Sequence, residues 1–315
     1  MAPRTVITVG NFDGVHRGHQ AILAHARNLA QTHGMTLIAI TFDPFPMHIL
    51  RPQQAPARLS DRDQRAALLH QAGADKVLVI EPTSEFLALD AATFLNELVR
   101  TWSPAYLVEG ANFRFGKGRG GDVKMLAQWG AQLGFEVQII EPVEVTLGTL
   151  SAVPVSSSLV RWLLLAGRVH DAGLCLGRPY SLSARVIQGE QRGRTLGFPT
   201  ANLDPALLLD RIVPCDGVYA AMVKLPDKQQ VPAAVSIGHK PTFGKMQKVI
   251  EAHLLNYQGD LYDQTIQVNF LRWVREQMSF TGLPALVDQI QRDVMQVRQW
   301  HAAGVGCESV SRFVV

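Results

Sequence analysis

The chain has 315 residues, of which 47% are hydrophobic and 18% are charged, and its formal net charge is +3. This length predicts about two domains, and the apolar content excludes an intrinsically disordered chain. No apolar run approaches the roughly 20 residues that a membrane-spanning helix needs, and residues 6–9 are too few for the apolar core of a signal peptide. We therefore expect a cytoplasmic protein that has no membrane partner.

Charge and cysteine content narrow the class further. Residues 1–176 contain 15 Lys and Arg and 15 Asp and Glu, while residues 177–315 contain 15 and 12. A protein that binds duplex nucleic acid has a denser basic surface, so we expect no nucleic-acid partner. Cys175, Cys215 and Cys307 lack the spacing of a metal or redox motif, and we interpret them as free thiols in a reducing compartment. The oligomeric state is left open.

Short apolar strands alternate with helices along the first half of the chain. We predict strands at 5–9, 36–42, 76–80, 106–108 and 136–140, and helices at 18–32, 63–71, 91–101 and 123–134. Buried strands that alternate with helices are typical of a parallel sheet, so the first half is predicted to be a doubly wound α/β domain.

From Tyr180 onward, short alternating strands replace the helical pattern. We predict strands at 181–187, 217–223, 232–236, 249–256 and 265–270. Turn residues separate them, and this spacing predicts a small antiparallel β-barrel. A terminal helix is predicted from apolar residues at helical spacing, namely Leu286, Ile290, Val294, Val297 and Trp300. We place the domain boundary near residues 174–178 and interpret residues 145–155 as a loop.

The junction between the first strand and the first helix has the composition of a phosphate site. It reads Gly10-Asn11-Phe12-Asp13-Gly14-Val15-His16-Arg17-Gly18-His19. Backbone N–H groups at such a junction point outward and bind anions. His16 and His19 are three residues apart, so both can face an α-phosphate and stabilise the charge that develops on it. Two histidines that only cap the helix are the alternative.

Two further segments of the first half can reach phosphates. Ser156, Ser157, Ser158 and Arg161 place hydroxyls and a cation at the start of a helix, although an ordinary serine N-cap is an equal alternative. Residues 110–122 look like a Walker loop, but the glycine spacing is one residue too long and Gly follows Lys117. We reject a P-loop there and expect a flexible loop with phosphate-reaching Arg and Lys.

A second glycine-rich segment covers residues 189–203. Gly189, Gly193 and Gly197 allow the backbone to fold over phosphates. Thr200 and Asn202 alternate in an extended run, so their side chains share a face. A hydroxyl and an amide oxygen suit Mg²⁺ that is also held by ATP phosphates. A Gly/Pro turn that enters a strand is the alternative.

Glu251 is a charged residue inside an otherwise apolar run, with His253 on the same side. A buried carboxylate is costly unless it has a partner or a task. Taking a proton from a hydroxyl as a general base is such a task. The exposed face of an edge strand is the alternative.

Residues 10–19, 156–161, 193–203 and 251–262 together closely resemble the bifunctional bacterial riboflavin kinase/FMN adenylyltransferase (FAD synthetase) family, and the resemblance covers nearly the whole chain. It extends to Gly238-His239-Lys240-Pro241-Thr242-Phe243, Asp260-Leu261-Tyr262, Arg272, Arg275 and Phe280.

The resemblance implies two domains with two reactions. A nucleotidyltransferase-type domain at residues 1–176 would adenylylate FMN to FAD and release pyrophosphate. A six-stranded kinase barrel with a terminal helix, at residues 177–315, would phosphorylate riboflavin to FMN. The substrates would be ATP, riboflavin and FMN, with Mg²⁺ accompanying ATP.

The resemblance also implies a role for each matching residue. His16, His19 and Glu251 would be catalytic, and Thr200 and Asn202 would bind Mg²⁺. The nucleotide- and flavin-binding positions would be Gly10, Asn11, Phe12, Asp13, Gly18, Asn112, Ser157, Ser158, Arg161, Gly193, Arg194, Gly197, Pro199 and Arg275.

Three residues depart from the family pattern. Ser158 replaces Thr but keeps the hydroxyl, Phe45 stands where His is frequent, and Asp263 stands where Gly is common. If that His contacts a phosphate, Phe45 would slow adenylylation, and Asp263 could change flavin affinity. A flavin-binding regulatory protein without one or both activities is therefore an alternative. An RNA-binding module, suggested by residues 114–121, is another, but the chain lacks an aromatic RNP-like run.

Overall fold

The computed structural model describes residues 4–190, 192–242 and 245–304. The chain forms two compact units, one of Met1–Val145 with Ala152–Ser157 and one of Thr146–Ser151 with Ser158–Val315. Both described cysteines are free thiols, Cys175 buried and Cys215 half-buried, whereas Cys307 lies outside the described residues. Across the described ranges, no helix is long and apolar enough to cross a membrane.

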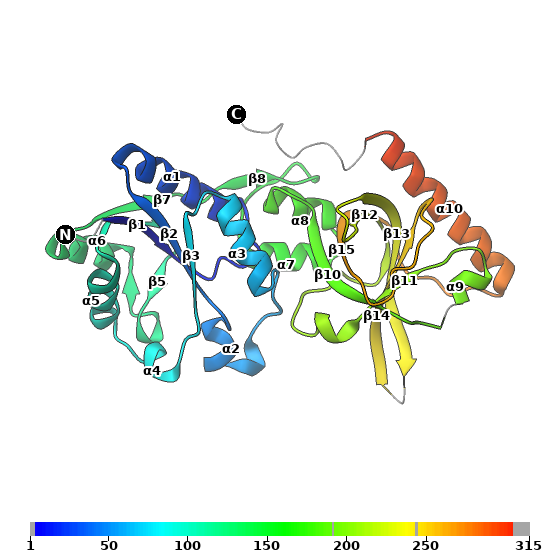
Figure 1. The fold of residues 1–315 in the computed structure, drawn as a ribbon, viewed down its shortest axis with the longest axis horizontal. Coiled ribbons are helices and arrows are strands. Elements are labelled where there is room, and N and C mark those ends of the chain that lie inside the picture. The colour runs from blue at the N-terminus through cyan, green and yellow to red at the C-terminus, as the bar shows by residue number, and fades with distance from the viewer. Residues whose placement is uncertain (1–3, 191, 243–244, 305–315) are drawn as a thin grey trace. The chain divides into compact units, whose positions relative to one another are not determined.

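A five-stranded parallel sheet forms the centre of the first unit (Figure 1). The strand order is β3-β2-β1-β4-β7. The strands are β1 (Thr5–Val9), β2 (Thr36–Phe42), β3 (Lys76–Ile80), β4 (Pro104–Gly110) and β7 (Glu136–Ile140). The chain continues to one side of β1 through β2 and β3 and to the other side through β4 and β7, so the strand order switches direction between β1 and β4. Open α/β sheets generally bind ligands at the carboxyl ends of the strands at such a switch point. The prediction of a doubly wound α/β domain is confirmed.

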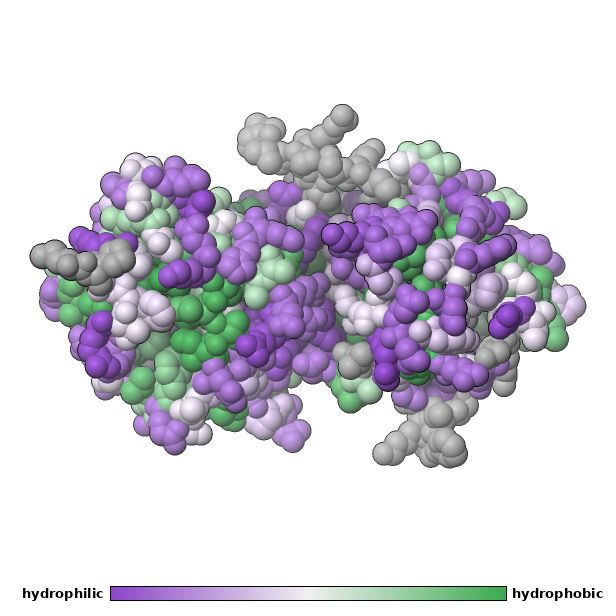
Figure 2. Space-filling model, in the orientation of Figure 1, coloured by the Kyte–Doolittle hydropathy of each residue, from purple (hydrophilic) through white to green (hydrophobic). Residues whose placement is uncertain are grey.

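Helices cover both faces of this sheet. The helices that pack on it are α1 (Arg17–His33), α3 (Arg62–Gln71), α5 (Ala91–Trp102) and α6 (Val123–Leu133). The connections also contain the short helices α2 (Pro46–Leu50) and α4 (Ser84–Leu87) and the 3₁₀ turn η1 (Pro52–Gln54). Val6 packs with α1 and α3 on one face, and Ile7 packs with α5 and α6 on the other. Both faces of β1 are thus covered, which explains why all five of its residues are buried. Figure 2 shows some hydrophobic residues among hydrophilic ones on the viewed face of this unit.

Two segments are more ordered than expected. The predicted loop at 145–155 is wrong in part, because β8 (Glu144–Thr146) and β9 (Ala152–Pro154) pair in a two-stranded sheet. Leu150 closes the intervening turn with φ of 60°, and strands of three residues are too short to show a period. The flexible loop expected within 110–122 is instead a hairpin of β5 (Arg114–Phe115) and β6 (Gly121–Asp122) around η2 (Lys117–Arg119).

A closed six-stranded barrel forms most of the second unit, with the order β10-β11-β14-β13-β12-β15 and antiparallel pairing throughout. The strands are β10 (Tyr180–Ile187), β11 (Ala201–Leu203), β12 (Gly217–Lys224), β13 (Gln230–Thr242), β14 (Lys245–Leu254) and β15 (Thr265–Arg275). The predicted barrel is confirmed, and the strand that sequence patterning missed, β11, has three residues.

The remaining elements of the described residues are the helices α7 (Ser157–Leu165), α8 (Val169–Leu176), α9 (Arg192–Thr195) and α10 (Leu283–Ala302) and the turn η3 (Pro205–Leu208). The glycine-rich segment expected as a loop thus contains the single helical turn α9. The predicted terminal helix is confirmed, and Figure 1 shows it along the barrel. Val294 and Val297 pack against Ala220 and Ala234 of the barrel, so the helix closes the core on one side.

Candidate active sites

The loop between β1 and α1 is held in a strained conformation. Phe12 and Val15 have φ of 48° and 41°, and Gly14 has φ of 78°. A positive φ is unfavourable for a β-branched residue such as Val. The turn is held by hydrogen bonds from Val15 N to Phe12 O (3.0 Å) and from Gly14 N to Ser60 Oγ (3.0 Å). Strain of this kind is concentrated at functional sites, where surrounding contacts maintain it.

The Asp13 side chain fixes this loop to a second segment. Its buried carboxylate accepts hydrogen bonds from Leu59 N (3.0 Å) and Ser60 N (3.1 Å). Ser157 Oγ donates to the Asp13 carbonyl over 2.9 Å. The carboxylate therefore acts here as an anchor of the loop, and Ser157, which the sequence singled out, contacts the loop directly.

His16 and His19 form a stacked pair at the start of α1. Their ring centroids are 3.7 Å apart with an interplanar angle of 18°, and Phe12 meets His19 edge-on at 5.2 Å. A Cβ added to Gly18 would lie 3.1 Å from His16 Cε1, so the intervening glycine leaves room for the stack. His16 is also the N-cap, since its Nδ1 accepts from His19 N over 3.4 Å. His16 thus caps the helix, and the role of the pair at a phosphate stays a prediction.

The environment of His19 favours the neutral imidazole. Burial and the adjacent His16 lower the pKa of His19 well below its usual value of 6.5. Among the residues that the structure describes, none makes a hydrogen bond to the buried Nδ1 of His19. A neutral ring at pH 7 can donate one N–H to a phosphate oxygen, so the pair is suited to hydrogen bonding rather than to supplying two full charges.

Glu109 lies near the carboxyl end of β4, beside β1. The strand pairing ends at Ile7 and Leu107, and beyond it Val9 N donates to Glu109 Oε1 over 2.7 Å. The side chain is 2% exposed, and this burial raises the pKa of Glu109 well above 4.5. Sequence reasoning missed this residue, although a Glu at the end of an apolar run is the same signal that drew attention to Glu251.

The other predicted residues of the first site belong to different segments of the chain. Gly10 N continues the strand pairing by donating to Ile40 O (3.0 Å), and exposed Asn11 accepts from Thr41 Oγ1 through its carbonyl (3.0 Å). Asn112 is exposed just before β5. Ser158 and Arg161 belong to α7 in the second unit.

The second unit contains a cavity of about 270 Å³ beside α10. Five residues predicted from the sequence line it, namely Gly193, Thr200, Asn202, Glu251 and Arg275. Arg194, Gly197 and Pro199 are outside the described lining, although Pro199 O accepts a hydrogen bond from His253 Nδ1, a lining residue, over 2.8 Å.

Strand pairing explains why three of these residues meet. Asn202 of β11 is opposite Glu251 of β14, which in turn is opposite Ser236 of β13. A Cβ added to Gly189 would lie 2.5 Å from Asn202 Nδ2, so a larger residue at 189 would displace the amide. The barrel has no edge at β14, which removes the interpretation of Glu251 as part of an exposed edge strand.

Lys240 enters the same cavity and pairs with two carboxylates. Its Nζ lies 2.7 Å from Glu251 Oε1 and 3.7 Å from Glu190 Oε2. The sequence placed Lys240 in a family-like block but did not indicate this contact. The pairing of β13 with β14 brings positions 240 and 251 together. Their separation in the sequence does not by itself predict a contact.

Arg275 is fixed by a bidentate ion pair with Asp293 of α10. Its Nε lies 3.0 Å from both carboxylate oxygens and its Nη2 lies 2.7 Å from Oδ2. Gln289 Nε2 adds a hydrogen bond to Asp293 Oδ1 (2.9 Å), and the guanidinium lies over Phe280. Asp293 therefore orients a predicted binding residue, although only its place on a helix was visible in the sequence.

No cluster of three or more His, Cys, Asp or Glu suited to a metal occurs within the described part of the chain. The oxygen donors of Thr200 and Asn202 face one cavity together with Glu251. Hard oxygen donors that leave most positions to water and phosphate are typical of Mg²⁺ sites that hold ATP.

Known proteins match both halves of the chain. A family model described as FAD synthetase matches residues 1–154, and one described as riboflavin kinase matches residues 176–301. A protein of Escherichia coli named bifunctional riboflavin kinase/FMN adenylyltransferase is 34% identical over 296 residues, covering 94% of this chain and 92% of the relative. A Pseudomonas fluorescens protein of the same name is 40% identical over 295 residues, covering 93% and 92%.

A solved structure supports the same fold. A protein of Streptococcus pneumoniae described as a macrolide-efflux protein matches with a TM-score of 0.85 and 29% identity, over 95% of each chain. Both family models match the chain, and relatives of this family align with it along nearly their whole length. The chain therefore belongs to the bifunctional riboflavin kinase/FMN adenylyltransferase family.

Proposed function

We propose that the two reactions of the family are divided between the two parts of the chain. Residues 1–176 form the FMN adenylyltransferase domain and residues 177–315 form the riboflavin kinase domain. The observation that carries the first assignment is the stacked pair of His16 and His19 at the start of α1, directly after the strained β1–α1 loop. The second rests on the cavity that brings Glu251 together with Thr200 and Asn202.

In adenylyl transfer, a phosphate oxygen of FMN attacks the α-phosphorus of ATP and pyrophosphate leaves. His16 and His19 donate hydrogen bonds to the α-phosphate, where negative charge increases. The loop with Gly10, Asn11, Phe12, Asp13 and Gly18 leads to the N-terminus of α1, whose backbone N–H groups bind the phosphates. Further phosphate and flavin contacts come from Asn112, Ser157, Ser158 and Arg161.

In the kinase reaction, the 5′-hydroxyl of riboflavin attacks the γ-phosphorus of ATP. Glu251 accepts the hydroxyl proton as general base. The segment with Gly193, Arg194, Gly197 and Pro199 covers the phosphates, and Arg275 holds the bound substrate. Because phosphoryl transfer requires little covalent chemistry from the protein, positioning and charge neutralisation dominate.

Thr200 and Asn202 would hold Mg²⁺ together with ATP phosphates. Their oxygen donors fit this ion, since both side chains line the cavity that contains Glu251. When bound, the ion would neutralise phosphate charge during transfer. A cytoplasmic location completes the proposal, because Cys175 and Cys215 are free thiols of a kind that persists in reducing compartments.

The test is a product assay on the purified full-length chain. Incubation with riboflavin, ATP and Mg²⁺ is expected to give FMN first and FAD later, separated by chromatography. Glu251→Gln should stop FMN formation from riboflavin but allow FAD formation from supplied FMN. Absence of both products from the wild-type chain would refute the proposal, and tight flavin binding without turnover would favour a regulatory flavin-binding protein.

A further inference from the structure

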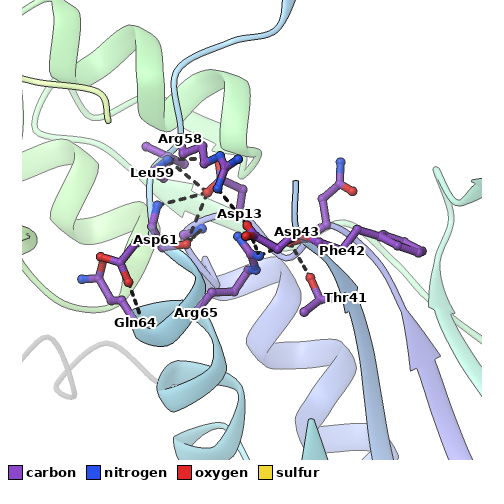
Figure 3. Close-up of polar contacts among 12 residues, drawn as sticks. Asp13, Thr41, Phe42, Asp43, Arg58, Leu59, Asp61, Gln64 and Arg65 are labelled. Atoms are coloured by element: carbon purple, nitrogen blue, oxygen red, sulfur yellow. Dashed lines mark hydrogen bonds and ion pairs between the residues drawn. The ribbon is translucent and has the colours of Figure 1, made fainter. Parts of the chain in front are cut away.

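Two arginines share one carboxylate beside the β1–α1 loop. Arg58 Nη1 lies 2.8 Å and Arg65 Nη2 lies 3.2 Å from Asp43 Oδ1, and Figure 3 shows the three side chains converging. Both guanidiniums also lie over the Phe45 ring, with Cζ 5.5 Å from its centroid for Arg58 and 4.5 Å for Arg65. The aromatic face and the carboxylate together hold two cations in one place.

Arg65 holds the chain segment that follows β2. Its side chain has no exposed area, and Nη2 donates to Phe42 O over 2.9 Å in addition to Asp43. Its Nε and Nη1 are buried, and the described residues offer them no hydrogen-bond partner. Burial of a guanidinium costs free energy unless its contacts compensate for the lost hydration. The contacts of Arg65 to Phe42, Asp43 and Phe45 indicate that it positions these residues.

Arg58 directly precedes the two residues that bind Asp13 of the β1–α1 loop. Leu59 and Ser60, the two residues after Arg58, bind the Asp13 carboxylate, and Ser60 also accepts from Gly14 N. Asp43 is the first residue after β2, the strand next to β1 in the sheet. Arg58 therefore lies at the carboxyl edge of the sheet where the β1–α1 loop begins, with 14% of its side chain exposed.

We infer that Arg58 is a further phosphate-binding residue of the adenylyl-transfer site and that it holds the two phosphates of ATP that leave as pyrophosphate. Asp43 and Arg65 are the positioning residues of Arg58. The inference rests on the proposed role of the β1–α1 loop. A guanidinium matches phosphate oxygens through two parallel N–H donors. Phe45, which stands where His is frequent in the family, then serves as a platform for the cations instead of supplying one.

The reverse reaction measures this contact directly. A pyrophosphate oxygen attacks the adenylyl phosphorus of FAD, the bond to the FMN phosphate oxygen breaks, and ATP and FMN form. With full-length protein, Arg58→Gln should raise the KM for pyrophosphate about tenfold or more, as expected for a lost charge-assisted hydrogen bond, while the KM for FAD changes less than about twofold. Arg58→Lys should give an intermediate KM, because it keeps the charge but loses the fork.

Asp43→Asn and Arg65→Lys should raise the KM for pyrophosphate in the same direction but less, and Arg62→Gln, which changes an exposed cation of α3, should not. Unchanged KM for pyrophosphate in both Arg58 variants would overturn the inference, as would equal increases for pyrophosphate and FAD. If the wild-type chain makes no FAD at all, the proposed function itself fails, so the two failures are distinguishable.

Discussion

Lys240 Nζ lies 2.7 Å from Oε1 of Glu251, the residue that we propose as the base of the kinase reaction. The ammonium also lies 3.7 Å from Glu190, in the segment that precedes α9. A base that is held by a cation has one oxygen less for the substrate hydroxyl. The γ-phosphate of ATP is a more highly charged partner for the ammonium than a single carboxylate. We therefore expect Lys240 to turn to the phosphate when ATP binds, which leaves Glu251 to riboflavin.

Lys240→Met tests this role. The change keeps much of the chain length and removes the cation, so the KM for ATP in FMN formation should rise and kcat should fall by roughly 10–100-fold. FAD formation from supplied FMN should be unchanged, because it belongs to the other domain. Lys224→Met, at the exposed end of β12, is the matched control. Normal kinase kinetics in the Lys240 variant would show that the ion pair is only structural.

His19→Ala is expected to separate the two activities. The change removes one donor of the stacked pair and should lower FAD formation by roughly 100-fold or more, while FMN formation from riboflavin continues. Both rates are measured on the same protein preparation by chromatography. His33→Ala changes a histidine in the last turn of the same helix and should leave both rates intact. A parallel loss of both activities in His19→Ala would contradict the division of labour.

The sequence predicts contacts between near neighbours and fails for contacts that depend on topology. His16 and His19 are one helical turn apart, so their shared face follows from spacing. The hydrogen bond between Val9 and Glu109 joins residues 100 positions apart. This hydrogen bond forms because β4 lies beside β1, and local sequence patterns do not predict this strand order.

Element length limited the prediction of the fold in the same way. Strands of five or more residues form apolar runs that are long enough to recognise in the sequence, and the long helix α10 shows apolar residues at helical spacing. The three-residue strands β9 and β11 are too short for a period to be recognised in the sequence. The pairing of β11 with β10 and β14 stabilises it in the barrel.

The ion pair between Arg275 and Asp293 leads to a prediction about both stability and binding. Asp293→Asn removes the charge that balances a guanidinium whose side chain is 15% exposed. Breaking such a pair should destabilise the second unit by roughly 3 kcal/mol, seen as a lower unfolding temperature. The KM for riboflavin should also rise, because Arg275 loses its orientation. Asp288→Asn changes an exposed carboxylate of the same helix and should alter neither quantity.

Glu109 should make the stability of the first unit depend on pH. Its pKa is raised in the folded chain by burial, so between about pH 4.5 and that raised value the folded state binds more protons than the unfolded state, and stability falls as pH rises. Glu109→Gln imitates the protonated carboxyl and can still accept from Val9 N. The variant should therefore unfold at a higher temperature than the wild type at pH 9, by about 2–5 °C, and the difference should shrink toward pH 5.

Thermal unfolding across this pH range, followed by circular dichroism, measures the effect. Glu81→Gln, which changes an exposed carboxylate after β3, controls for the loss of one negative charge. Parallel unfolding curves for the Glu109 variant and the wild type would mean that the carboxyl ionises without cost in the folded chain. A difference in unfolding temperature that narrows toward acid pH would instead show that a neutral acid joins β1 to β4 near the carboxyl ends of these strands, where an ionised one would repel the phosphates of ATP.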